Sequence, residues 1–357
     1  MSQEGAYYVG MDIHKEIIAY CVKNDRGETI MHGDIAANKK SLLLWEQELP
    51  HPWIGAMEAT MFTGWIYDTL RPYAKELITA NPLMMKAISS AKKKNDATDA
   101  EKLSDMLRID YIPRCYMAPS DIRELRRVLR FRNFFVRHCT ALKNKNASML
   151  MECGVEYSKK RLHGKRYFKN LLETLEEVPP SLSSLLTINK DVIDQMSKVQ
   201  RLLVKGLQET KLLKERAERL MTIPGVGEVL ALTWALEIAE PERFSSIRKA
   251  ISYCGLCSAQ KESAGKRQRG PISKQRNEHI QWILVEAAKI AVRYNQSLAK
   301  VYAHEAVKGG RNRATLAVAR KLVAYLLAVD KSGRPFEDRQ AQKMEKETGE
   351  GRAPSLS

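Results

Sequence analysis

The chain contains 357 residues, of which 44% are hydrophobic and 28% are charged, a balance typical of globular proteins that bury a core. This length predicts two or three domains. The longest apolar runs, such as 322–329, are much shorter than a membrane span, which needs roughly 20 residues. Residues 1–5 lack the basic and apolar regions of a signal peptide. We therefore expect a soluble intracellular protein and exclude transmembrane, collagen and disulfide-scaffold classes.

The net charge is +17, and it is distributed unevenly along the chain. Residues 1–110 hold 13 basic and 16 acidic side chains, whereas the remaining residues hold 46 basic and 26 acidic ones. This asymmetry predicts a near-neutral first domain joined to a body that binds a polyanion such as nucleic acid. The alternative is a basic protein whose charge has no target.

The first third of the chain alternates between short apolar runs and segments of helical spacing. The predicted strands cover 7–11, 17–22, 29–33, 53–57 and 77–79, and the predicted helices cover 39–49, 62–71 and 97–108. The turn signal Asn81-Pro82 is expected to stop the last of these strands. Three early strands followed by alternating helices and strands indicate a mixed sheet with helices on its faces.

Helices dominate the rest of the chain. Two stretches without Gly or Pro, 120–151 and 181–205, have an apolar spacing that suits an antiparallel coiled coil, and the second continues to 220. The segment 153–180 between them is expected to be partly irregular. Further helices are predicted at 229–238, 246–256, 277–294 and 312–329, with an exposed basic loop at 258–276 and a disordered tail after 336.

Four carboxylates of the first third stand where a sheet commonly binds ligands. Asp12 and Glu58 each close a predicted strand, at the edge where ligands of α/β sheets are found. Asp96 and Asp99 lie three residues apart at the start of a predicted helix, so both fall on one face. Asp96 or Asn95 could also serve only as the N-cap of that helix.

Clustered carboxylates repel one another and usually require cations. Oxygen ligands favour Mg²⁺ or Mn²⁺, and two such ions about 4 Å apart can support phosphoryl transfer. The alternative for each residue is an exposed strand end or a helix cap. The joint pattern within a basic protein favours the metal site, with Asp12, Glu58, Asp96 and Asp99 as its ligands.

Several motifs, taken together and in order, resemble one family. The front motifs are Val-Gly-Met-Asp-Ile-His-Lys around Asp12, Met-Glu-Ala-Thr around Glu58 and Asn-Asp-Ala-Thr-Asp-Ala around Asp96 and Asp99. The rear motifs are Ile-Pro-Gly-Val-Gly at 223–227, Tyr-Cys-Gly-Leu at 253–256, and Glu-Ser and Gly-Pro-Ile-Ser-Lys within 262–274. Over 6–336 the chain is similar to the DEDD transposases of bacterial and archaeal insertion sequences, the bridge-RNA-guided recombinases related to pilin-gene invertases.

The resemblance implies a fold class of α/β plus α. It implies a RuvC-like, RNase H-type domain at 1–110, a helical coiled-coil region for nucleic-acid binding and oligomerisation at 111–217, and a mostly helical transposase domain at 218–336. Residues 337–357 would form the tail. It also implies cytoplasmic, nucleoid-associated action in a prokaryote.

The resemblance also implies a chemistry. Asp12, Glu58, Asp96 and Asp99 would hold Mg²⁺, and by motif position Ser263 would attack a DNA phosphate to form a phosphoserine link. The element's ends and its target would be the DNA substrates, a noncoding RNA would guide the choice of target, and a homodimer or homotetramer would assemble. A departure from the family's pattern is Ala-Gly-Lys after Ser263, where further small Ser or Gly residues are common.

Three other functions remain open at this point. The first is a site-specific invertase of the same relatives, with accessory proteins in place of RNA. The second is a RuvC-like nuclease or junction resolvase, in which a metal-activated water replaces Ser263. The third is a catalytically inactive nucleic-acid-binding protein.

The remaining candidates would hold nucleic acid. Gly225 and Gly227 fit a helix-hairpin-helix turn that brings backbone amides to a phosphate, with a simple tight turn as the alternative. Basic side chains flank Ser263 and follow the long helix; those expected to contact phosphate are Arg123, Arg126, Arg127, Arg130, Lys143, Lys266, Arg267 and Arg269. The phenylalanines between them, Phe131, Phe134 and Phe135, are expected to be core. The pair Cys254 and Cys257 reads as buried thiols rather than a zinc site.

Overall fold

The computed structural model describes residues 5–88, 95–175, 178–263, 265–273 and 275–337, and the side chains of 260–263 and 266–269 are outside that description. The chain folds as two compact units, Met1–Ser120 and Asp121–Ser357. The tail expected to be disordered lies outside the described residues except for Glu337. No helix in the described ranges is long and apolar enough to cross a membrane.

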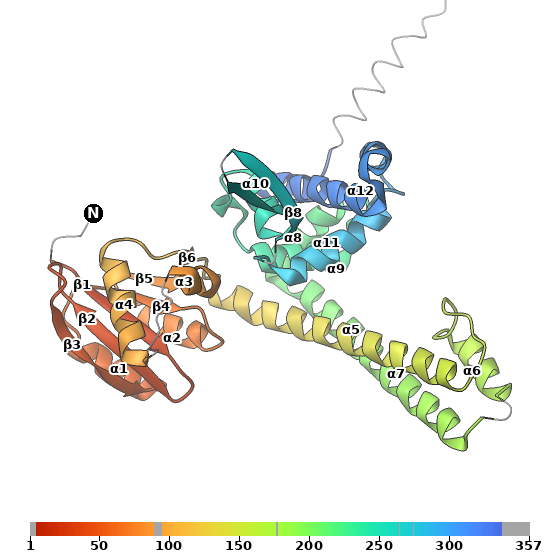
Figure 1. The fold of residues 1–357 in the computed structure, drawn as a ribbon, viewed down its shortest axis with the longest axis horizontal. Helices are drawn as coiled ribbons and strands as arrows, with labels where there is room; N and C mark the ends of the chain where they lie inside the picture. The colour runs from red at the N-terminus through yellow and green to blue at the C-terminus, as the bar shows by residue number, and fades with distance from the viewer. Residues whose placement is uncertain (1–4, 89–94, 176–177, 264, 274, 338–357) are drawn as a thin grey trace, which may run out of the picture. The chain divides into compact units, whose positions relative to one another are not determined.

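The first unit is built on a six-stranded mixed sheet with strand order β3-β2-β1-β4-β5-β6 (Figure 1). Its strands are β1 (Tyr7–Ile13), β2 (Ile17–Lys23), β3 (Thr29–Ala36), β4 (Trp53–Glu58), β5 (Glu76–Ala80) and β6 (Arg114–Cys115). β1, β2 and β3 run antiparallel, whereas β4 is parallel to both β1 and β5. The predicted mixed sheet is confirmed, although the two-residue β6 was not expected.

Helices cover both faces of this sheet (Figure 1). Leu42 and Trp45 of α1 (Lys39–Glu48) and Ile66 of α2 (Thr63–Leu70) pack with Val9 and Met11 of β1 on one face. On the other face lie α3 (Pro82–Ile88) and α4 (Asp96–Arg108). The helix α3 was missed because Asn-Pro reads as a strand stop, yet Asn81 Oδ1 accepts a hydrogen bond from Leu83 N at 3.1 Å and caps a helix that starts with proline.

A glycine on the central strand lets α4 lie directly on the sheet. A Cβ at Gly10 would stand 2.1 Å from Ala100 O and 2.5 Å from Ser104 N, both backbone atoms of α4. The buried Lys23 of β2 then holds the same helix through Asp105 at 2.7 Å and Glu101 at 3.1 Å. The start of α4 is thereby fixed relative to β1, where Asp12 lies.

Substitution of Gly10 with alanine is expected to destabilise the first unit by about 3 kcal/mol, because overpacking against backbone forces α4 off the sheet. Gly206, a helical glycine where a Cβ would meet none of the described atoms within 4 Å, supplies the matched control. Gly206→Ala should stabilise the chain by about 0.5–1 kcal/mol. Urea unfolding followed by circular dichroism measures both, and equal effects would refute this account of Gly10.

The second unit begins with two long antiparallel helices, α5 (Ser120–Glu152) and α7 (Pro180–Glu209), which lie side by side (Figure 1). Asn189 Nδ2 of α7 donates to the buried Asn146 Oδ1 of α5 at 2.9 Å, and Gln200 Nε2 donates to Cys139 Sγ at 3.2 Å. Their far end is closed by α6 (Lys165–Glu173), a helix within the segment that was expected to be partly irregular.

The rest of the second unit is a helical bundle with one hairpin. Its elements are α8 (Lys211–Met221), α9 (Glu228–Ile238), η1 (Pro241–Arg243), α10 (Ile247–Tyr253), β7 (Ser258–Ser263), β8 (Lys266–Ile272), α11 (Glu278–Ala291) and α12 (Gln296–Ser332). α12 is interrupted by non-helical backbone at Gly309 and Gly310. The prediction of an exposed loop at 258–276 is wrong, because residues in this range pair as the antiparallel strands β7 and β8.

Candidate functional site

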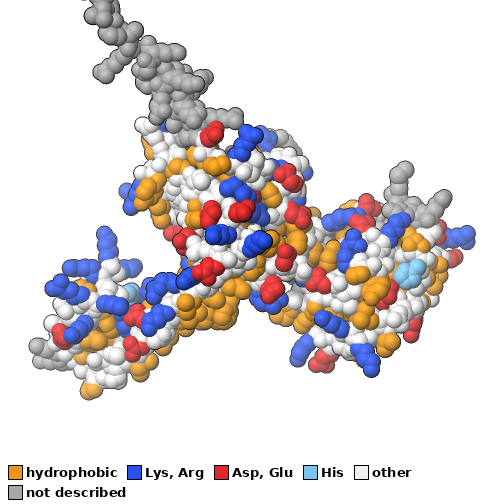
Figure 2. Space-filling model, turned by 180° about the vertical axis from the view of Figure 1, so that it is seen from behind, with side chains coloured by type: hydrophobic (Ala, Val, Ile, Leu, Met, Phe, Trp, Pro, Cys, Tyr) orange, Lys and Arg blue, Asp and Glu red, His pale blue; other side chains and the backbone are white. Residues whose placement is uncertain are grey.

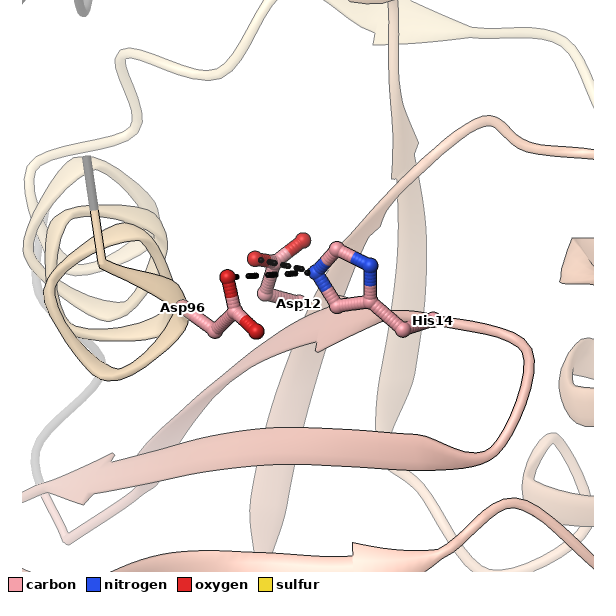
Figure 3. A group of neighbouring side chains, drawn as sticks. All are labelled: Asp12, His14 and Asp96. Atoms are coloured by element: carbon pink, nitrogen blue, oxygen red, sulfur yellow. Dashed lines mark hydrogen bonds and ion pairs between the residues drawn. The ribbon is translucent and has the colours of Figure 1, made fainter.

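The first candidate site lies at the end of β1. His14 Nε2 stands 3.2 Å from Asp12 Oδ2 and 3.4 Å from Asp96 Oδ1, so one imidazole nitrogen faces both carboxylates, which lie next to each other (Figure 3). One donor atom from each of the three residues lies within 4.8 Å of the others. The Asp12 side chain is 15% exposed, whereas His14 and Asp96 are about half exposed. The cluster is therefore anchored on the sheet and open to large substrates.

Local structure explains how Asp96 and Asp99 come to this edge. Asn95, not Asp96, caps α4, since its side chain accepts a hydrogen bond from Ala97 N at 3.3 Å. Asp96 is thereby released from the capping role and reaches toward Asp12. Asp99, one turn further, is held by Lys102 at 3.1 Å and still contributes its charge at Asp12.

Glu58 ends the strand next to β1. Met57 pairs with Met11 and Ala56 with Gly10 in the parallel register. Because side chains alternate along a strand, Glu58 and Asp12 share the face that α4 covers. Among the described residues, Glu58 and Asp99 do not belong to the group of donor atoms that lie within 4.8 Å. The structure brings Asp12 and Asp96 together, whereas Glu58 and Asp99 lie outside this close group of donor atoms.

The electrostatics of this cluster match a cation site. Burial raises the pKa of Asp12, the hydrogen bond and charge of His14 lower it, and the charges of Asp96 and Asp99 raise it, so the net direction is upward. Carboxylates that lie this close to one another repel, and a divalent ion would relieve that repulsion. The carboxylate oxygens suit Mg²⁺ or Mn²⁺, whereas an imidazole nitrogen is a ligand that Zn²⁺ or Fe²⁺ prefers. His14 is the residue that sequence reasoning missed, although it lies in the motif around Asp12.

The second candidate, Ser263, ends strand β7 and pairs with Lys266 across the tip of the hairpin. Arg267 and Arg269 of β8 pair with Glu262 and Gln260. The register places these residues around one turn on the backbone. The side chains of Ser263, Lys266, Arg267 and Arg269 lie outside the described part of the structure.

Two of the predicted phosphate-binding arginines have partners inside the protein. Arg130 donates to both carboxylate oxygens of the buried Glu237, at 2.9 and 2.8 Å, and Arg126 donates twice to Leu236 O, at 2.9 and 2.7 Å. Asn277 Nδ2 completes the cluster with a 2.7 Å hydrogen bond to Glu237. These two arginines hold α5 against α9. Their side chains therefore have a structural role, whether or not they also contact nucleic acid.

The phenylalanines of α5 are not core, contrary to the sequence prediction. Phe131 and Phe134 are 53% and 49% exposed, and their rings stack in parallel at 6.0 Å. The buried stripe of α5 instead passes through Ile122, Leu129 and Cys139. Phe131 and Phe134 lie outside that stripe, and each also contacts the ring of Phe135.

The turn at 223–227 joins α8 to α9 as expected, but its two glycines differ in role. Gly225 has a positive φ of 87°, and a Cβ there would stand 2.4 Å from Ala291 Cα, so close packing against α11 requires this glycine. A Cβ at Gly227 would meet no described atom within 4 Å. Gly227 is exposed and is the N-cap residue of α9.

A basic surface that the sequence analysis did not single out covers the far end of the helical pair. Residues 159–169 hold six Lys and Arg and neither Asp nor Glu, and all six are exposed. Figure 2 shows Lys and Arg side chains gathered there, at the left of the view. The pKa of His163 is lowered by burial and by the charges of Lys143 and Lys190. We call residues 159–169 the basic tip. The segment contains no recognisable motif, so its excess of Lys and Arg is the only sequence signal that could have pointed to this surface.

Comparisons with known proteins bear on both units. A model described as "Transposase", of the DEDD type of IS110, matches residues 9–154, and one described as "Transposase IS116/IS110/IS902 family" matches residues 217–303. The chain belongs to the IS110/IS116 transposase family. The DEDD match contains Asp12, Glu58, Asp96 and Asp99, and the second match contains Ser263.

Three curated relatives that are similar to this chain are named as transposases. The transposase for insertion sequence element IS1328 of Yersinia enterocolitica is 23% identical over 79% of this chain and 83% of the relative. The probable family 20 transposase of Pseudomonas aeruginosa is 25% identical over 69% of this chain and 73% of its own length. The transposase for IS1111A of Coxiella burnetii is 24% identical, with 66% of each chain covered. The transposase is thus an enzyme that cleaves and rejoins DNA, and its DEDD domain points to divalent-metal use.

Proposed function

We propose that this transposase moves an insertion sequence by joining two chemistries, a divalent-cation site in the first unit and a serine nucleophile in the second. The observation that carries the proposal is the convergence of Asp12, His14 and Asp96 at the open end of β1. The strand order, with three antiparallel strands followed by parallel β4 and β5, supports an RNase H-type fold of the RuvC-like kind.

The carboxylates divide the work of holding cations. Asp12 and Asp96 supply the central oxygens, and Asp99 and Glu58 stand beside them to complete a site for two Mg²⁺ or Mn²⁺ ions. Ions bound there would neutralise a DNA phosphate and stabilise the leaving oxygen. His14 is hydrogen-bonded to Asp12 and orients that carboxylate before an ion arrives.

Ser263 supplies the nucleophile. A bond forms between its Oγ and the phosphorus of one DNA strand while the bond from phosphorus to O3′ breaks, and the hydroxyl proton passes to a base as the 3′ oxygen becomes a hydroxyl. Lys266, Arg267 and Arg269 neutralise the phosphate from the facing strand of the hairpin. Religation reverses the same step with a new 3′ hydroxyl.

A covalent-trapping assay tests the serine. Purified protein, a divalent salt, DNA carrying the element's ends and RNA transcribed from the noncoding flank are combined and separated on a denaturing gel. Wild type should form a protein–DNA adduct that Ser263→Ala abolishes and Ser258→Ala, a change at the far end of the same strand, preserves. Cleavage without an adduct, insensitive to Ser263→Ala, would instead identify a nuclease that uses water.

Nucleic acid lies along the second unit in this proposal. The basic tip, Arg123, Arg127, Lys143 and the backbone at Gly227 contact phosphates without reading sequence. A guide RNA supplies target choice, and a homodimer or homotetramer joins two DNA ends. Neither unit contains a zinc finger or homeodomain among its described elements, in keeping with a choice of target that rests on RNA.

Replacing Lys159, Lys160 and Arg161 of the basic tip with glutamine should weaken DNA binding and reduce the slope of log K against log salt by about 2 to 3, because each phosphate contact contributes roughly 0.9. Changing three exposed lysines elsewhere in the second unit, Lys205, Lys211 and Lys214, alters the net charge equally and should leave the slope nearly constant. Fluorescence anisotropy at several salt concentrations measures both. Equal slopes for the two triple variants would mean that the tip does not touch DNA.

A further inference from the structure

A cavity of about 880 Å³ opens between α5, α11 and α12, within the second unit. Its volume lies in the range of about 300–1,000 Å³ typical of small-ligand sites. The residues that line it in the described part of the structure all belong to the second unit.

One wall of the cavity is an exposed aromatic surface. Ile280 and Leu284 of α11 are fully buried, and Trp282 lies between them in sequence, so its ring points away from the core. Trp282 is 43% exposed and lines the cavity with Val285 and Leu316. An indole ring beside an open cavity offers a flat face to another ring.

Positive charge surrounds this wall. Arg137, Arg276 and Lys289 line the cavity, whereas Glu278 is its acidic residue. Glu278 is bound to Arg137 at 3.0 Å, and Lys289 to Glu286 at 2.7 Å. Arg276 is exposed, and its charge also lowers the pKa of Glu278. The balance favours an anionic occupant that brings its own negative charge.

Neutral hydrogen-bonding groups complete the lining. His279 and Asn312 present an imidazole and a carboxamide to the cavity. The pKa of His279 is lowered by burial and by the charge of Arg130, so the ring is neutral at pH 7 and can both donate and accept. Asn312 is brought there by the break at Gly310, after which α12 resumes.

We propose that this cavity holds one unpaired nucleotide of the nucleic acid on which the transposase acts, with its base stacked on Trp282 and its phosphates at Arg276 and Arg137. A stacked, paired base in a duplex has no face to offer, so the site distinguishes unpaired from paired strands. The inference rests on the proposed function, since strand exchange and RNA guidance both expose unpaired nucleotides. DNA and RNA share this chemistry, and the probes below separate them.

The test uses pentanucleotides of DNA and of RNA that carry 2-aminopurine, in EDTA, with the full chain. Wild type should quench the probe's fluorescence on binding. Trp282→Ala should remove the quenching and weaken pentanucleotide binding by about tenfold while duplex binding changes less than twofold. Trp282→Phe should restore much of the affinity, and Arg276→Gln should weaken binding of single strands.

The matched control is Tyr294→Ala, since Tyr294 is 68% exposed near the end of the same helix and lies outside the cavity. It should bind both probes as wild type does. Equal losses for single strands and duplex, or no loss in Trp282→Ala, would overturn the proposal. Tighter binding of the DNA or of the RNA pentanucleotide would show which of the two nucleic acids supplies the nucleotide. The binding assay needs no cleavage, so Asp12→Ala should bind the pentanucleotides as wild type does. A failure of the proposed cleavage mechanism can therefore be told apart from a failure of this nucleotide site.

Discussion

Asp12→Asn should reduce DNA cleavage by about 10³-fold or more while the fold stays intact. The substitution keeps the size of the side chain and a group that can face His14, but it removes the negative charge of the most buried carboxylate in the cluster. Loss of an outer partner of a metal ligand typically costs 10–100-fold, roughly, so loss of a ligand itself should cost more. Titration calorimetry with Mn²⁺ should show weaker binding in parallel.

The control for this experiment is Asp34→Asn, which removes the same charge from an exposed position on β3 of the same sheet. It should cleave DNA at the wild-type rate. Full activity in Asp12→Asn would disprove the metal site, whereas unchanged Mn²⁺ affinity with lost activity would assign Asp12 to DNA positioning instead.

Glu237→Ala should destabilise the second unit by about 2–3 kcal/mol, because it leaves the largely buried Arg126 and the partly exposed Arg130 without their counter-charge. Glu237 is fully buried and accepts hydrogen bonds from Arg130 and Asn277, and Arg126 lies 3.7 Å away. Glu209→Ala breaks an exposed pair with Lys205 and should cost less than about 1 kcal/mol. Urea unfolding compares the two, and similar losses would show that the buried cluster adds no special stability.

The same residue makes stability depend on pH. Burial alone would raise the pKa of Glu237, but the hydrogen bonds and charges of Arg130, Asn277 and Arg126 outweigh it and hold the pKa below its usual range. A carboxyl with a lowered folded pKa stabilises the protein above its unfolded pKa of about 4.3, and that stability is lost as the pH falls through the folded pKa. Glu237→Gln should lack this part of the acid sensitivity. An unfolding free energy that falls equally in both proteins between pH 5 and pH 3 would place the acid sensitivity elsewhere.

Helix and strand positions followed from local patterns wherever one pattern dominated. Alternation and apolar runs located β1 and β4, and the stretch without Gly or Pro located α5 to within a residue or two. The local patterns gave wrong predictions where the same residue types are compatible with two different structures. Asn81-Pro82 both ends β5 and begins α3, and the basic residues of 258–276 form a hairpin although their charge reads as loop.

Charge was the least decisive local signal. Arg126 and Arg130 are indistinguishable in sequence from their neighbour Arg127, yet their partners lie more than a hundred residues away, at 236 and 237. The phenylalanines of α5 were assigned to the core because they are apolar, but burial depends on which face of a 33-residue helix meets a neighbour. Only the assembled bundle decides that face.

The sequence by itself determined the mixed sheet, the long helices, the basic character and the residues from which a metal site could be built, because each depends on local composition and spacing. The tertiary structure alone decided that Asp96 lies close to Asp12, that one nitrogen of His14 faces both carboxylates and that Glu58 shares the sheet face of Asp12. Those contacts depend on α4 lying against Gly10 and on the parallel register of β1 with β4. Distances between residues far apart in sequence are set by packing, which no local pattern contains.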